Sequence, residues 1–152
     1  MGRISIHQLK QYKAEGKRFA MITAYDYPMA RLVEQAGVPV ILVGDSLGSV
    51  VLGYESTVPV TMDDILYHTR AVVRATSKAI VVADMPFMSY QTDPVEALKS
   101  AGRLIKEGGA ESVKLEGGAE YAELALRLSR LGIPVMGHIG LTPQSVHTLS
   151  GF

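Results

Sequence analysis

Residues 38–46, Val-Pro-Val-Ile-Leu-Val-Gly-Asp-Ser ("VPVILVGDS"), decide the fold of this chain. The first six are apolar and rich in Val, which is typical of a β-strand buried on both faces. Residues 79–86, "AIVVADMP", repeat the pattern, and the segment between the two runs has helical spacing. Buried strands that alternate with helices predict a parallel α/β sheet.

Other elements are predicted from caps, Gly stops and apolar spacing on either side of these two strands. Helices are expected over residues 5–16, 29–37, 61–75, 92–109 and 119–132, strands over 18–24, 111–118 and 133–140, and a loop over 48–59.

Polar and glycine residues gather where the predicted strands end. The four strand ends are Gly44-Asp45-Ser46, Ala83-Asp84, residues 114–117 and Gly137-His138. Functional groups at the ends of many successive strands are typical of a (β/α)8 TIM barrel, whereas an open sheet concentrates them at one crevice. A full barrel takes about 250 residues, so this chain has room for about the first five βα units. We therefore predict that residues 1–152 form a single domain, the N-terminal part of a TIM barrel whose C-terminal part is absent.

The composition excludes several classes of protein. The 152 residues are 47% apolar and carry 15 basic and 15 acidic side chains, so there is no basic stripe for nucleic acid. The absence of Cys excludes disulfides, thiolate metal sites and a Cys nucleophile. No secretory signal and no apolar run of about 20 residues is present. We expect no membrane partner and a cytoplasmic location.

Three acids lie at the ends of three successive strands: Asp45, Asp84 and Glu116. Adjacent strands lie about 4.8 Å apart, so two such carboxylates repel each other unless a proton or cation lies between them. Mg²⁺ prefers oxygen ligands and keeps some of its water. We predict a Mg²⁺ site on these three acids, with Glu116 reaching the metal directly or through water. The alternative is that each acid caps a helix or pairs with Lys114.

Lys114 and His138 are candidate contacts for an anionic substrate. Lys114 lies two residues before Glu116, so both point to the same side of their strand, which is the interior of a barrel. A lysine there is costly unless it meets an anion. A substrate carboxylate or an internal ion pair both satisfy this condition. His138 ends the last strand, where a substrate contact is slightly favoured over a structural role.

Ser46 allows a second interpretation of the same stretch, because Gly-Asp-Ser-Leu is also a signature of serine esterases. Such a nucleophile needs a His base held by an acid. The Asp-x-x-His element that supplies it in those esterases does not occur in this sequence. Ser46 is therefore assigned to substrate binding, and a serine hydrolase remains a less favoured alternative.

Five stretches of the chain resemble the ketopantoate hydroxymethyltransferase (3-methyl-2-oxobutanoate hydroxymethyltransferase) family. They are "MITAYDYPMARLVEQAG" (21–37), "ILVGDSLGSVVLGYESTVPVTMDDILYHTRAVVR" (41–74), "VVADMPFMSY" (81–90), "SVKLEGG" (112–118) and "PVMGHIGLTPQSV" (134–146). They cover almost the whole chain in order, and the second and fifth stretches are highly specific.

The resemblance implies a TIM barrel of the phosphoenolpyruvate/pyruvate superfamily and a homo-oligomer, typically a decamer. It implies transfer of a hydroxymethyl group from 5,10-methylenetetrahydrofolate to 3-methyl-2-oxobutanoate through a Mg²⁺-stabilised enolate. The product is 2-dehydropantoate, on the way to pantothenate and coenzyme A. The small-molecule partners are thus a 2-oxo acid and a folate.

The resemblance also assigns roles to the residues at the strand ends. It implies Mg²⁺ ligation by Asp45 and Asp84 with Glu116 as the third acid, and oxo-acid contacts from Asp45, Ser46, Asp84, Lys114 and His138. The family's general-base glutamate lies beyond Phe152, so no catalytic residue is assigned in this chain and we expect it to be inactive alone. Another Mg²⁺-dependent carbon–carbon lyase or mutase of the superfamily, or a non-catalytic partial barrel, remains the alternative.

Overall fold

The computed structural model describes residues 2–148. The strands are β1 (Met21–Thr23), β2 (Val40–Val43), β3 (Ile80–Asp84), β4 (Ser112–Glu116) and β5 (Val135–His138). The helices are α1 (Ile6–Ala14), α2 (Tyr27–Gln35), α3 (Leu47–Val50), α4 (Met62–Ala75), α5 (Pro94–Lys106) and α6 (Ala122–Arg130), with 3₁₀ turns η1 (Ala119–Tyr121) and η2 (Pro143–Ser145). Residue 1 and residues 149–152 lie outside the described residues.

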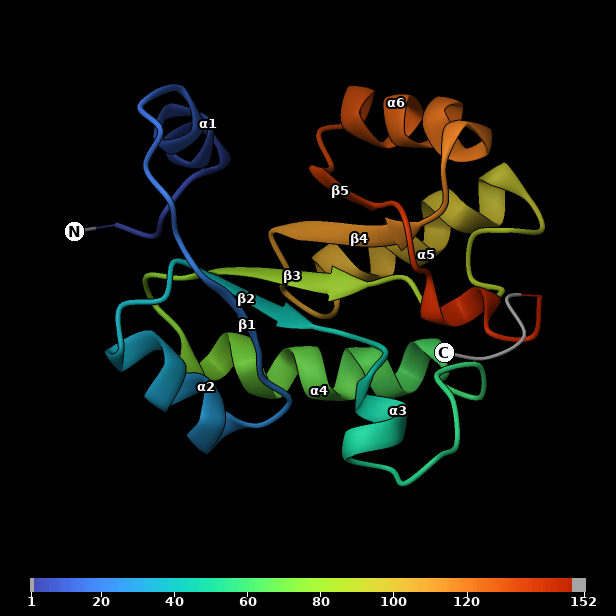
Figure 1. Ribbon diagram of the computed structural model, residues 1–152, viewed down its shortest axis with the longest axis horizontal. Helices are drawn as coiled ribbons and strands as arrows, with labels where there is room; N and C mark the ends of the chain where they lie inside the picture. Colours follow the sequence, from blue (N-terminus) through green and yellow to red (C-terminus); the bar gives the residue numbers. More distant parts are fainter. Residues whose placement is uncertain (1, 149–152) are drawn as a thin grey trace.

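The strands form one parallel sheet in the order β1-β2-β3-β4-β5, so each strand pairs with the next one along the chain. Sequential order with a helix after each of β1 to β4 is the pattern of a (β/α)8 barrel. The predicted α/β class and parallel sheet are confirmed. Figure 1 shows the sheet as a curved layer with α2 and α4 along one side.

Three predicted boundaries were wrong. The strand expected over residues 18–24 is reduced to β1, all three residues of which are exposed, because an edge strand is covered on one side only. The loop expected over 48–59 begins with the short helix α3. The helix expected over 119–132 begins as the 3₁₀ turn η1 and continues as α6.

Alternation along the strands separates two faces of the sheet. On the outward face, Ile41, Val81 and Val113 lie in the main core with residues of α2, α4, α5 and α6. On the inward face, Val40, Leu42, Ile80 and Val82 form a second cluster, against which Ile6, Leu9 and Met136 pack. Helix α1 is therefore the element that covers the inward face among the described residues.

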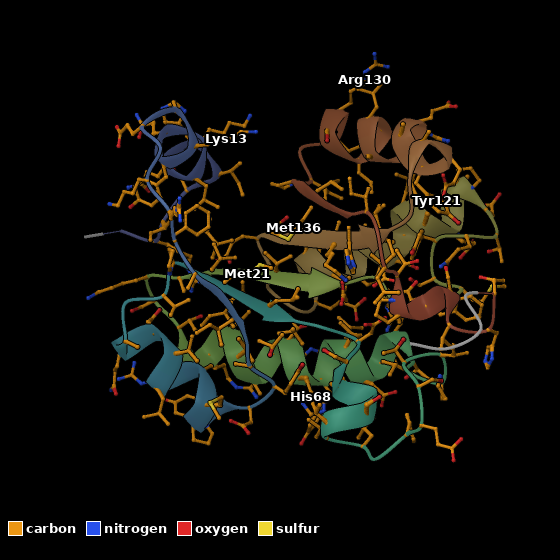
Figure 2. The ribbon with its side chains drawn as sticks, viewed as in Figure 1. Lys13, Met21, His68, Tyr121, Arg130 and Met136 are labelled. Atoms are coloured by element: carbon orange, nitrogen blue, oxygen red, sulfur yellow. The ribbon has the colours of Figure 1, made fainter. Side chains whose placement is uncertain are left out.

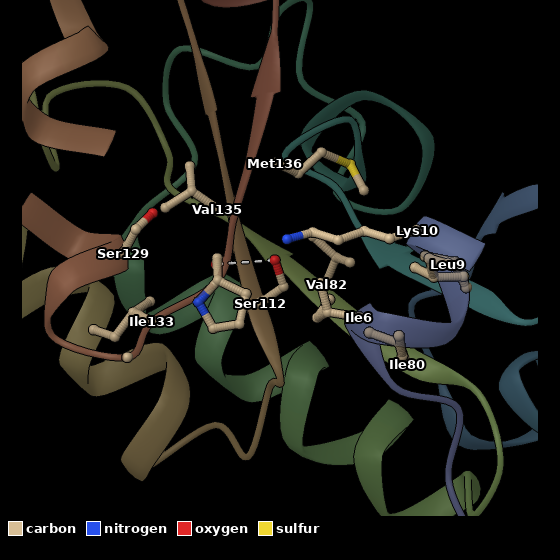
Figure 3. Close-up of a pocket in the computed structure, with 13 residues that line it drawn as sticks. Ile6, Leu9, Lys10, Ile80, Val82, Ser112, Ser129, Ile133, Val135 and Met136 are labelled. Carbon is tan, nitrogen blue, oxygen red and sulfur yellow. Dashed lines mark hydrogen bonds between the residues drawn. The ribbon is translucent and has the colours of Figure 1, made fainter. Parts of the chain in front are cut away.

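The inward face is incompletely filled near the amino ends of the strands. A cavity of about 510 Å³ lies there between α1 and the segment leading into β5. Figure 3 shows Leu9 and Lys10 of α1 on one side of it and Ile133 and Val135 on the other. Its walls are mostly apolar and include Val40, Ile80 and Ser112, the first residues of β2, β3 and β4, so it lies at the opposite end of the strands from the acids.

The helices that follow the strands begin at side-chain caps. Thr61 and Asp64 form a capping box at the start of α4, and Asp93 accepts two backbone N–H groups at the start of α5. Such caps satisfy N–H groups that have no partner within the helix. Across residues 2–148, no helix combines the length and apolar character needed to cross a membrane.

Candidate active site

Strand register places the polar strand ends opposite one another. Asp84 of β3 pairs with Lys114 of β4, and Glu116 of β4 pairs with His138 of β5. All four residues have the parity of the inward face, because Ile80 and Val82 precede Asp84 at even spacing on the same strand. The prediction that Lys114 and Glu116 point to the inward side is therefore confirmed.

The cluster is a buried network of ion pairs. Lys114 donates from Nζ to Oδ1 of Asp84 and lies 3.6 Å from Oε1 of Glu116. The Nδ1 atom of His138 lies 3.0 Å from the same Glu116 oxygen. Asp84 and Glu116 are 1% and 3% exposed, so their charges are compensated within the protein and not by water. The internal ion pair considered for Lys114 is thus formed.

Asp45 joins the network from the turn after β2. Its backbone N–H donates to Oδ2 of Asp84 at 2.9 Å, and its own Oδ2 accepts from Nε2 of Gln144 at 2.8 Å. Gly44 makes this approach possible, because a Cβ at that position would lie 3.3 Å from Oδ2 of Asp84 and 2.9 Å from Oγ of Ser46. The close approach of Asp45 and Asp84 therefore requires a residue without a side chain at position 44.

Burial controls the pKa values of these groups. Burial raises the pKa of Asp84 to about 7 against the opposing charge of Lys114, and the charge of Asp45 adds to the rise. Burial likewise raises the pKa of Asp45, against the hydrogen bond from Gln144. Burial lowers the pKa of Lys114, but the attraction of Asp84 and its neighbouring acids outweighs it, and the net shift is upward. A further cation beside Asp45 and Asp84 would favour their ionised forms.

Ser46 has a different neighbour from the one a nucleophile needs. Its Oγ lies 2.7 Å from the hydroxyl of Tyr25, with either atom able to donate. His68 extends from α4 (Figure 2) and donates from Nδ1 to the backbone carbonyl of Tyr25 at 2.6 Å. Within residues 2–148, no His hydrogen-bonds Ser46, which leaves the serine hydrolase interpretation without its base.

Sequence reasoning missed three contributors. Tyr25 and His68 support Ser46, and Gln144 in η2 links Asp45 to Glu116. Gln144 lies in the "GLTPQS" stretch that carries the resemblance, which was the one available signal. Among residues 2–148, His7 and His147 take part in none of these contacts.

The donor set fits a divalent cation. Three carboxylates, Asp45, Asp84 and Glu116, are buried with a single ammonium group, so negative charge is in excess. Mg²⁺ binds through one or two carboxylates and retains water molecules. In the described part of the chain, no group of three or more His, Asp or Glu side chains is arranged to hold a metal ion. The metal ligands therefore stay a prediction.

The structure thus brings together every predicted site residue at one end of the sheet. Ser46 lies at its margin, and 34% of the His138 side chain is exposed. A cavity of about 200 Å³ adjoins Glu116 and Gln144 and is walled in part by Phe87 and Tyr121. Acids, a lysine and a small cavity at the carboxyl ends of parallel strands are typical of an enzyme site in a barrel.

Solved structures share this architecture. The chain matches phosphonopyruvate hydrolase, crystallised with oxalate and Mg²⁺, with a TM-score of 0.70 and 16% identity over 95% of this chain and 54% of that one. It matches 2,3-dimethylmalate lyase, a member of the PEP mutase/isocitrate lyase superfamily, with a TM-score of 0.66 and 17% identity over 93% of this chain and 54% of that one. At such identities the likeness establishes the fold alone, and it confirms the predicted partial TIM barrel.

Sequence relatives define the family within that fold. Residues 3–152 match the family model of ketopantoate hydroxymethyltransferase, and the chain belongs to this family. It is 62% identical over all its residues to the 3-methyl-2-oxobutanoate hydroxymethyltransferase of Carboxydothermus hydrogenoformans, covering 55% of that protein. It is 59% identical over 99% of its length to the enzyme of the same description from Moorella thermoacetica, covering 56% of it. The chain spans about half the length of the curated relatives it matches.

Proposed function

We propose that this chain provides the metal and oxo-acid half of a hydroxymethyltransferase site. The enzyme would transfer a hydroxymethyl group from 5,10-methylenetetrahydrofolate to 3-methyl-2-oxobutanoate and release 2-dehydropantoate. The observation that carries the proposal is the buried cluster of Asp45, Asp84, Glu116 and Lys114, in a chain of the matching family. The folate donor, a homo-oligomer and a cytoplasmic location are parts of the proposal that come from the resemblance.

Asp45 and Asp84 are proposed to hold Mg²⁺, with Glu116 acting through a water molecule. When bound, Mg²⁺ withdraws electrons from the keto and carboxylate oxygens of an oxo acid and stabilises the negative charge that develops as the C3 proton leaves. The hydrogen bonds of Asp45 and Asp84 to Gln144 and to backbone N–H fix the orientation of their carboxylates.

Lys114 and Ser46 are proposed to bind the oxo acid. Lys114 carries a positive charge in a site that excludes water, where such a charge stabilises a developing anion far more than it would in solvent. Ser46 offers a hydroxyl that Tyr25 holds in place. His138 is proposed to contact the substrate carboxylate, because its ring is only partly covered and lies beside Glu116.

Turnover is proposed for the longer family protein. Lys114 is already paired with Asp84, and the acids of the cluster are the predicted metal ligands, so none of these side chains is assigned the task of removing the C3 proton. The resemblance assigns this task to a glutamate that is not among residues 1–152. The family match, and not the fold likeness, favours the transferase over a lyase or mutase, because the relatives at 59% and 62% identity carry the transferase description.

Calorimetric titration of 3-methyl-2-oxobutanoate into the chain tests the proposal. We expect binding that requires Mg²⁺ and that weakens by at least about 100-fold in Asp84→Asn. Loss of a residue that only orients a metal ligand already weakens metal binding by about 10- to 100-fold, and Asp84 is proposed to bind the metal directly. Asp63→Asn is the matched control, since Asp63 is an exposed residue of α4 that pairs with Arg103. Equal affinity with and without Mg²⁺ in all three proteins would contradict the metal-dependent site.

A further inference from the structure

Gln144 is a buried polar residue that joins three strands. It lies in η2, after β5, and is 5% exposed. Its Nε2 group donates to Oδ2 of Asp45 at 2.8 Å and to the carbonyl of Met85 at 3.0 Å. Its backbone N–H donates to Oε2 of Glu116 at 3.1 Å. One residue thereby contacts the ends of β2, β3 and β4.

The acceptor side of the same amide faces two donors. Oε1 of Gln144 accepts from the hydroxyl of Tyr90 at 2.9 Å and from Nε2 of Gln91 at 3.0 Å. A side-chain amide has two donor hydrogens and two acceptor lone pairs; both hydrogens are engaged, and each lone pair has a donor within hydrogen-bond distance. Rotating the amide by 180° would place Oε1 against the carboxylate of Asp45 and the carbonyl of Met85. The network therefore permits one orientation, in which N–H points at Asp45.

Tyr90 holds this amide in turn. Its hydroxyl lies 2.9 Å from both Oε1 of Gln144 and the backbone carbonyl of Glu116, and its single hydrogen is shared between these two acceptors. The same oxygen accepts the backbone N–H of Glu116 at 3.0 Å. The ring is 3% exposed and packs edge-on against Tyr121 with ring centroids 5.1 Å apart. The buried Tyr90 side chain thus connects Glu116 of β4 to the Gln144 amide that contacts Asp45.

We propose that Gln144 is a positioning residue for Asp45, fixed by Tyr90, and that it orients the Asp45 carboxylate toward a divalent cation. It occupies Oδ2 of Asp45 with a neutral donor. A neutral donor keeps the negative charge of the carboxylate available to a metal, whereas a lysine or arginine there would compete with it. This inference rests on the proposed metal site.

Mn²⁺ binding by the chain, followed by electron paramagnetic resonance, tests the role of Gln144 without any activity measurement. We expect Gln144→Met to weaken Mn²⁺ binding by about 10- to 100-fold, the usual effect of removing an outer-shell partner. Tyr90→Phe should weaken it in the same direction and by less, because the amide keeps Gln91 and Met85. Gln35→Met, the same substitution at an exposed position of α2, is the matched control and should bind as wild type.

Two outcomes separate this inference from the proposed function. A wild-type chain that binds no Mn²⁺ would overturn the metal site itself, whereas wild-type affinity in Gln144→Met would overturn only the role of Gln144. If Gln144→Met does not fold, as judged by circular dichroism, nuclear magnetic resonance of the wild type decides. Mn²⁺ should then broaden the side-chain amide signal of Gln144 ahead of that of Gln35, and equal broadening would contradict the proposal.

Discussion

At the scale of single residues, the site is defined by charged side chains that are buried away from water. Lys114 is 7% exposed and lies among carboxylates that are buried as well. Its ammonium group is the one lysine or arginine cation that the structure places within this cluster, among residues 2–148. Burying ions costs several kcal/mol for each, so the arrangement depends on mutual compensation. Removing one charged partner should therefore lower the free energy of unfolding by more than the intact ion pair contributes to it.

Lys114→Met should lower the free energy of unfolding by about 3–5 kcal/mol, because it leaves Asp84 buried and unpaired. Added Mg²⁺ should stabilise this variant more than wild type, since a divalent cation can replace the missing charge. Urea unfolding with and without Mg²⁺ measures both effects. Lys99→Met, at an exposed ion pair on α5, is the control and should change little. Equal responses of the two variants to Mg²⁺ would refute the explanation.

At the scale of elements, one side chain of α2 binds the backbone of the segment that leads into β3. Glu34 of α2 accepts backbone N–H groups of Ser77 and Lys78, each at 2.7 Å, and of Ala79 at 3.0 Å, just before β3. Burial raises the pKa of Glu34, but these backbone hydrogen bonds outweigh it and hold the pKa below its usual value. The carboxylate thus ties α2 to the start of β3.

Glu34→Gln should destabilise the protein by about 1 kcal/mol at neutral pH, because glutamine keeps one acceptor but loses the charge. A folded-state pKa below the unfolded value contributes stability while the group is ionised, and this contribution is lost as pH falls through the lowered pKa. The difference from wild type should therefore be greatest at neutral pH and vanish in acid. Unfolding measured across this range checks the trend, with exposed Glu55→Gln as the control. A difference that grows in acid would be the wrong sign.

At the scale of the whole molecule, the two faces of the sheet are covered unequally. Helices α2, α4, α5 and α6 pack on the outward face, while the inward cluster of Val40, Leu42, Ile80 and Val82 is covered by α1. Ile6 and Leu9 supply the contacts from that helix. The stability of the described fold should accordingly depend on a helix with no fully buried residue.

Leu9→Ala should lower the free energy of unfolding by about 1–2 kcal/mol, since part of a leucine side chain is returned to water. It should also increase the fluorescence of a dye that binds apolar surfaces, because the inward cluster would be uncovered. Leu32→Ala on α2 is the matched control, as Leu32 is 62% exposed. Identical dye binding by the two variants would show that α1 does not protect the inward face.

Much of this fold is readable from periodicity. The buried runs around Val40 and Ile80 identify their strands, and the signals at Thr61 and Asp93 identify helix starts, because these are local effects. The short edge strand β1 and helix α3 were misjudged, since their lengths depend on what packs beside them. The partial barrel was predicted correctly from the polar residues at the strand ends.

The sequence by itself determined the parallel α/β order, the family and the candidate residues Asp45, Ser46, Asp84, Lys114, Glu116 and His138, because spacing along a strand fixes which side chains share an end and a face. The tertiary structure alone decided their pairings: Lys114 with Asp84, Ser46 with Tyr25, and Asp45 with Gln144. Asp45 and Gln144 are 99 residues apart, and no local pattern encodes a contact at that separation. It follows from strand register and from the folding of η2 over the strand ends, which are properties of the packed molecule.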